Sequence, residues 1–295
     1  MRPGSVVARV PAPALFVGSG LAQYIGAALA VGLFVSIPAV GVGWLRILVA
    51  AVVLVAWRRP WRLRWSRHDL VLVALFGLAL GVMNVAFYVA IDHLPLGTAV
   101  AIEFAGPVVV AAATGSGWRE RIGIALAAAG VVLLAGVTLG SDAPGVAVGL
   151  IAIGVAATAW AGYIVLGRRV AVRGDGITRL SVAMAVAAVV GAPFLVASAA
   201  PVLGAWQLAT AVVGVALLSS VLPYAVEQVV LRRVGPAAFA VLLAMLPATA
   251  AVVGAVALRQ WPNAVELAGL ALVSLAIGLT SRQRPEPVTA PDVGA

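Results

Sequence analysis

The sequence predicts an all-α membrane protein with ten transmembrane helices, arranged as two inverted five-helix repeats. First, the 295 residues are 63% hydrophobic and only 10% charged, which leaves too little polar surface for a soluble protein of this size. Second, ten apolar runs have about the 20 residues that a helix needs to cross the hydrocarbon core of a bilayer. Third, each half of the chain holds five runs. Because five is odd, the second half must enter the membrane in the opposite orientation to the first.

The ten runs follow one another with only short turns between them. They cover residues 13–34, 41–57, 70–91, 96–114, 121–139, 146–167, 177–198, 207–231, 237–258 and 264–281. Turn-forming sequences such as Gly140-Ser141-Asp142 separate them. We therefore expect a first five-helix repeat in residues 1–140, a second, inverted five-helix repeat in 141–281, and a Pro-rich, disordered cytoplasmic tail in 282–295.

The arginines predict the orientation in the membrane. All nineteen basic residues are arginine, and the net charge is +9. With the N-terminus in the cytoplasm, seventeen of the nineteen fall on the cytoplasmic side, Arg259 falls in an outer loop and Arg46 within a span. The positive-inside rule therefore places both termini in the cytoplasm. Because the arginines are scattered between spans, they do not form a nucleic-acid-binding face.

Glu103 is the leading candidate for a functional residue. Apolar residues flank it for more than a helical turn on both sides, and Pro107 follows four residues later. A proline cannot donate a hydrogen bond to the carbonyl four residues back, so a carboxyl group and a freed carbonyl share one level of the span. Such groups should face a protein interior or a wet cavity. Glu103 is therefore either a proton-coupling or cation-binding residue, or a structural partner for Arg46.

The other polar residues within the spans are candidate substrate ligands. Arg46 would bind a substrate carboxylate with two parallel hydrogen bonds, or neutralise Glu103, or extend toward the outer surface. Asn84 and Tyr88 lie one turn apart on one helix face, where they would bind substrate or link helices. Four weaker candidates, also within spans, are Gln23, Tyr24, Trp160 and Tyr163.

A weak internal match supports the two repeats. A shift of 140 residues places Pro107 over Pro247 and Asn84 over Tyr224, which adds Tyr224 to the candidate ligands. Pro223 and Pro247 should loosen the eighth and ninth spans, as hinges or as simple kinks. Two inverted halves with broken helices in matching positions are typical of secondary transporters, whose site lies between the repeats.

Missing residue types narrow the function further. The chain has no cysteine and no lysine, which excludes disulfides, thiolate metal sites and the phosphate-binding loop of an ATP-driven pump. The spans hold no serine–histidine–acid set and no histidine cluster spaced for a metal. We therefore expect a non-enzymatic transporter with no metal or cofactor. A non-transporting receptor or scaffold is the alternative from another class, and the absence of a soluble domain counts against it.

The stretch PLGTAVAIEFAGP at residues 95–107 resembles the EamA-type transporters of the drug/metabolite transporter superfamily, and more narrowly the threonine/homoserine exporters of bacterial inner membranes. The resemblance implies export of small amino acids or related metabolites by proton antiport with alternating access. The partners would be a small solute, protons and the lipid bilayer. The family pattern places a glutamate before the ninth-span proline, where this chain has Leu246. Proton coupling would then depend on Glu103 alone or follow another scheme. The alternative substrate is another class of metabolite or drug.

Overall fold

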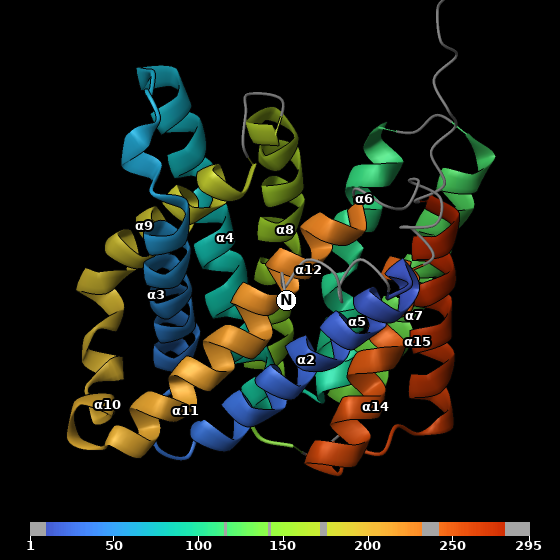
Figure 1. Cartoon of the computed structure of the whole chain (residues 1–295). Helices are drawn as coiled ribbons and strands as arrows, with labels where there is room; N and C mark the ends of the chain where they lie inside the picture. Colours follow the sequence, from blue (N-terminus) through green and yellow to red (C-terminus); the bar gives the residue numbers. More distant parts are fainter. Residues whose placement is uncertain (1–9, 115–116, 141–142, 172–175, 232–241, 281–295) are drawn as a thin grey trace, which may run out of the picture.

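Figure 1 shows the computed structural model, which describes residues 10–114, 117–140, 143–171, 176–231 and 242–280. Within these ranges the regular structure is entirely helical. The elements are α2 Ala12–Leu33, α3 Ala39–Arg58, η1 Pro60–Arg62, α4 Arg67–His93, α5 Leu96–Glu103, α6 Ala105–Thr114, α7 Trp118–Leu139, α8 Val146–Ala171, α9 Gly176–Leu195, η2 Ala197–Ala199, α10 Pro201–Gly204, α11 Trp206–Ala216, η3 Leu217–Val221, α12 Leu222–Leu231, α14 Leu246–Leu258 and α15 Ala264–Thr280. The predicted tail at 282–295 lies outside the described residues.

Eight helical segments in the described ranges are long and apolar enough to cross a bilayer. They are Ala12–Leu33, Ala39–Arg58, Arg67–His93, Leu96–Thr114, Trp118–Leu139, Val146–Val170, Gly176–Leu195 and Trp206–Val226. Two further apolar helices, Leu242–Leu258 and Ala264–Thr280, are shorter. The all-α membrane class is confirmed, whereas the count of ten spans stays a prediction.

The outside of the helix bundle is apolar. Val132 on α7, Ile151 on α8, Val189 on α9 and Val256 on α14 are each more than two-thirds exposed. Exposed tryptophans lie within about three residues of the ends of α3, α7, α11 and α14, at Trp57, Trp61, Trp118, Trp206 and Trp261. Exposed aliphatic side chains together with indole rings near the helix ends are the arrangement that membrane-spanning helices adopt.

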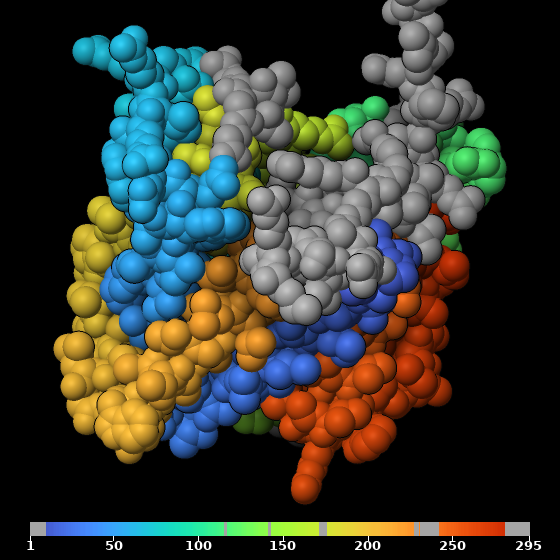
Figure 2. All heavy atoms as spheres, viewed as in Figure 1, coloured from blue at the N-terminus to red at the C-terminus, as the bar shows by residue number. Residues whose placement is uncertain are grey.

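The most extensive helix contacts join the first half of the chain to the second. Helix α4 packs against α8 and α9, α3 against α9, and α7 against α15. Helix α2 runs obliquely between these groups and contacts α11, α12 and α14 (Figure 1). Figure 2 shows the atoms of α2, in dark blue, directly against those of α11 and α14. The interior enclosed by these helices is therefore lined by both halves.

Three helix irregularities lie close to prolines. Helix α5 ends at Glu103 and α6 begins at Ala105, just before Pro107. A turn at Met245 precedes α14, in which Pro247 is the second residue. The segment η3 is a π-helix, in which the Leu222 N–H donates to the Leu217 carbonyl, and it is followed by Pro223. Prolines remove helical hydrogen bonds, and single π-turns are frequent at functional sites.

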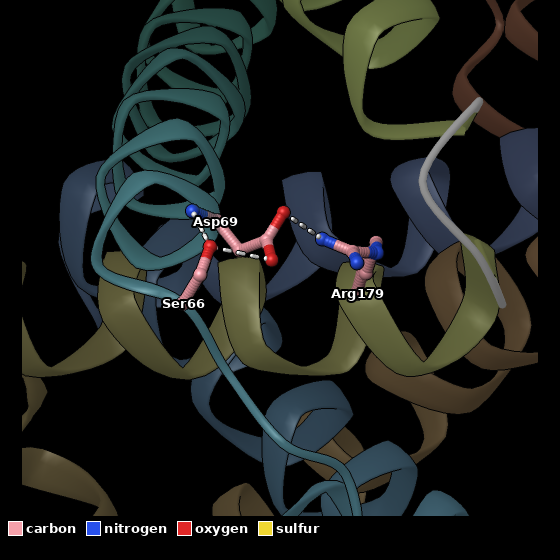
Figure 3. A network of polar contacts seen from close by, with 3 residues as sticks. All are labelled: Ser66, Asp69 and Arg179. Carbon is pink, nitrogen blue, oxygen red and sulfur yellow. Dashed lines mark hydrogen bonds and ion pairs between the residues drawn. The ribbon is translucent and has the colours of Figure 1, made fainter.

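A polar cluster fixes the start of α4 to α9 (Figure 3). The Ser66 hydroxyl accepts from the Asp69 N–H at 3.1 Å, which caps α4, and it also bonds Asp69 Oδ2 at 2.8 Å. Asp69 Oδ1 accepts from Arg179 Nη1 at 3.2 Å. The Arg179 guanidinium also lies over the Trp65 ring, 5.3 Å from its centroid.

Candidate functional site

A polar cavity of about 180 Å³ lies inside the bundle. It is smaller than the roughly 300–1,000 Å³ of pockets for drug-sized ligands, so it suits a small solute. Eight of the nine residues predicted to couple protons or bind substrate line it: Gln23, Tyr24, Arg46, Asn84, Glu103, Trp160, Tyr163 and Tyr224. Side chains up to two hundred positions apart in the chain therefore meet in one chamber.

Glu103 reaches this cavity from the broken helix. It is the last residue of α5, and its side chain is partly exposed to the cavity. Tyr24 and Arg46 are its electrostatic neighbours. Among the described residues, however, no ion pair joins Glu103 to Arg46. In this conformation Glu103 and Arg46 line the same cavity without forming a structural ion pair.

Arg46 is held on one side and left open on the other. It is only 7% exposed, so it does not extend to the outer surface. Its Nη1 donates to the Ser219 carbonyl at 3.4 Å and to Ser219 Oγ at 3.2 Å. The guanidinium lies 4.8 Å from the centroid of the Tyr88 ring. Nε is buried and has no hydrogen-bond partner among the described residues. The guanidinium can therefore still donate to an anion in the cavity.

Tyr88 supports Arg46 from behind and does not line the cavity. It is fully buried, and its hydroxyl lies 3.4 Å from Ser219 Oγ. The sequence placed Tyr88 beside Asn84 on one helix face, as a substrate ligand or as a link between helices. Asn84 does line the cavity, and its Nδ2 donates to the Leu80 carbonyl of its own helix at 2.8 Å. That bond lies within one helix, so it does not link two spans.

Aromatic rings form the wall beside Glu103. Trp160 on α8 meets Phe104 edge to face, with ring centroids 4.7 Å apart. Tyr163, one turn further along α8, stacks on Phe76 of α4 at 4.5 Å. These contacts fix the two α8 rings by packing against rings of the first half. An apolar group of the solute would therefore meet a preformed surface.

The three predicted hinge prolines occupy different places. Pro223 lines the cavity, whereas Pro107 and Pro247 do not. Each of these two instead follows a helix break whose adjoining residue, Glu103 or Leu246, does line it.

Ser219 is a polar residue of the cavity that was not predicted from the sequence, and it accepts hydrogen bonds from Arg46. It looked like an ordinary serine in an apolar run, yet it carries both hydrogen bonds of Arg46. A usable signal was present, because Pro223 follows Ser219 at the same spacing as Pro107 follows Glu103. The cavity is also lined by Phe16, Ser19, Ala27, Met83, Phe87, Phe104 and Leu243. In the part of the chain that the structure describes, no three His, Cys, Asp or Glu residues gather as a metal site.

Comparison with known proteins identifies the family. Residues 147–282 match the EamA-like transporter family. The threonine/homoserine exporter RhtA of Salmonella typhimurium (strain SL1344) is 35% identical over 264 residues, which cover 89% of this chain and 88% of that protein. RhtA of Escherichia coli (strain K12) is 34% identical over 263 residues, 88% of each chain. The chain belongs to the EamA-like transporter family.

A solved crystal structure supports the fold of this EamA-like transporter. That structure is 19% identical and superposes with a TM-score of 0.57, covering 92% of this chain and 99% of the other. With the apolar helices described above, these relatives identify the chain as a multi-pass transporter of the bacterial inner membrane.

Proposed function

We propose that this EamA-like transporter exports small amino acids, with threonine and homoserine as the first candidates, in exchange for protons. One observation carries the proposal: a small cavity holds an arginine with free donors and a separate carboxyl group. A zwitterionic amino acid has the complementary pair of charges. The relatives named threonine/homoserine exporters supply the candidate substrates.

In the proposed complex each charge of the amino acid meets an opposite charge of the cavity. The carboxylate accepts hydrogen bonds from Arg46, and the ammonium group lies on the side of Glu103 and Tyr24. Asn84 and Gln23 offer amide groups to a substrate hydroxyl. The small volume of the cavity limits the size of the side chain that the substrate can carry.

Glu103 is the proposed coupling residue. A carboxyl group enclosed within a helix bundle can bind and release protons, as acidic residues inside transporters do. It would take up a proton from the outer side as the amino acid leaves, and release it to the cytoplasm before the next one binds. Each proton that enters across 100 mV supplies ~2.3 kcal/mol toward export.

We further propose that the alternating access comes from two inverted halves, residues 1–140 and 141–281, with the two shorter apolar helices as spans nine and ten. The helix contacts support this, because they recur when the halves are exchanged. Helix α4 packs on α8 as α12 packs on α2, and α6 packs on α8 as α14 packs on α2. The pairs α3–α9 and α7–α15 join equivalent helices, and the pair α5–α14 joins the fourth span to the ninth.

The arginine bias supports a topology with both termini in the cytoplasm. The cysteine-free chain allows a direct test of this topology. A single cysteine at Arg62 should react with an impermeant maleimide only after the membrane is opened, whereas one at Trp261 should react in intact cells. The reverse result would refute the proposed orientation.

Overexpression in bacteria tests the substrate. Cells should become resistant to inhibitory threonine or homoserine and should accumulate the amino acid in the medium, whereas cells with Arg46→Met should not. A receptor or scaffold predicts no change in either measurement. A panel of other amino acids and drugs run beside these two would show whether another class is the substrate.

A further inference from the structure

The π-helical segment η3 places Ser219 against helices α3 and α2. Because Pro223 has no N–H, it cannot donate to the Ser219 carbonyl as residue 223 of a regular helix would. That carbonyl instead accepts from Arg46 Nη1 of α3 at 3.4 Å. On the other side α2 approaches so closely that a Cβ at Gly26 would lie 2.9 Å from the Ser219 Cβ.

The hydrogen bonds of the Ser219 hydroxyl can be assigned completely. A serine hydroxyl has one proton and two lone pairs. The proton goes to the Val215 carbonyl, which Oγ approaches to 2.6 Å. Both remaining contacts of Oγ must therefore be accepted bonds, one from Arg46 Nη1 at 3.2 Å and one from the Tyr88 hydroxyl at 3.4 Å. Ser219 thus fixes both the cation and the ring beneath it.

These bonds determine which part of Arg46 is available. Nη1 is occupied by the two oxygens of Ser219, and the Tyr88 ring covers one face of the guanidinium. Nε stays without a partner among the described residues although Arg46 is 93% buried and lines the cavity. The free donors therefore lie in a fixed plane, as recognition of a planar carboxylate requires.

We infer that Ser219 is a positioning residue, which orients Arg46 so that its remaining N–H groups recognise the carboxylate of the transported solute. The inference rests on the proposed function, because it assumes that a carboxylate binds in the cavity. Arg46 belongs to the first half of the chain and Ser219 to the second. Carboxylate recognition then requires that the two halves keep the contact between Arg46 and Ser219.

Binding of two ligands to purified protein in nanodiscs tests this role. One ligand is threonine, and the other is the amino alcohol made by reducing the carboxyl group of threonine. Ser219→Ala should weaken threonine binding about 10-fold, the size of one hydrogen bond to a charged group, and leave the affinity for the amino alcohol unchanged. Ser219→Thr should restore threonine binding because it keeps the hydroxyl.

Ser220→Ala is the matched control, since Ser220 is a buried neighbour in the same segment and does not line the cavity. It should bind both ligands as the wild type does. Equal affinities of Ser219→Ala and Ser220→Ala for threonine would overturn the inference. An equal loss for both ligands would also overturn it, because that result indicates general damage.

Pro223→Ala provides a second test that does not depend on removing a hydroxyl. Alanine supplies an N–H that can donate to the Ser219 carbonyl and so competes with Arg46. We expect threonine affinity to fall about threefold while the melting temperature stays the same or rises. Pro193→Ala, in the interior of α9 and away from the cavity, is the control and should leave affinity unchanged. Unchanged affinity in Pro223→Ala would count against the inference. A wild type that does not bind threonine overturns the proposed substrate and this inference together.

Discussion

Replacing Arg46 by lysine keeps the charge in the cavity and removes the planar geometry. Arg46 has Nη1 committed to Ser219, and its buried Nε has no hydrogen-bond partner among the described residues. In the proposed complex Nε and Nη2 would therefore be the donors to an incoming carboxylate. A lysine ammonium group has all its N–H donors on one nitrogen. It can therefore bind Ser219 or the carboxylate, but it cannot hold both in the fixed planar geometry of a guanidinium. The loss of one charge-assisted hydrogen bond is worth about 1.5–3 kcal/mol. We therefore expect Arg46→Lys to bind threonine about 10- to 150-fold more weakly than the wild type.

The assay is equilibrium binding of radiolabelled threonine to protein in nanodiscs, with the melting temperature measured beside it. Arg179→Lys is the matched control, because Arg179 is 8% exposed, also buried, and does not line the cavity. It should bind threonine with wild-type affinity. Arg46→Lys with unchanged affinity would refute bidentate recognition. Equal losses in the two variants would show that the effect comes from the fold.

Three further variants test other parts of the account. Leu246→Glu places a second acid in the cavity, and we expect the ratio of protons to substrate to rise when both fluxes are measured in proteoliposomes; an unchanged ratio would show that a second carboxyl group does not couple. Asp69→Asn removes the charge that faces Arg179 at 3.2 Å, and it should lower the melting temperature by about 2–4 °C without changing threonine affinity; a change in affinity would extend the site to this cluster. Trp160→Ala opens the aromatic wall against Phe104, so the export panel should show gain of larger amino acids; a loss of all transport with no gain would contradict a wall that sets substrate size.

Much of the site could be predicted from the sequence, because polar side chains within apolar spans are energetically costly and therefore few. That scarcity identified Arg46 and Asn84, which the structure brings into one cavity with Glu103. The position of Tyr88 could not be read the same way. A tyrosine one turn from Asn84 shares its face of the helix, yet packing of Phe34 and Phe87 around the ring keeps Tyr88 away from the cavity.

Ser219 shows why the remaining parts escaped prediction. A serine within an apolar run most often bonds its own helix, as Ser219 also does with Val215. Its importance depends on a partner 173 residues away and on a π-turn that hydrophobic periodicity does not reveal. The spacing of four residues between Ser219 and Pro223 was the one local sign of a carbonyl available to another helix.

The most direct test of the central claim is proton movement driven by substrate in proteoliposomes that contain wild-type protein or Glu103→Gln. With the wild type, an outward threonine gradient should drive protons inward and acidify an enclosed pH-sensitive dye. Glu103→Gln should bind threonine more weakly, because the carboxyl group that faces the ammonium group is lost. It should still exchange threonine for threonine across the membrane, because Arg46 and its supports are intact, but its proton movement should fall to the level of empty liposomes. Proton movement at the wild-type rate in Glu103→Gln would contradict the account.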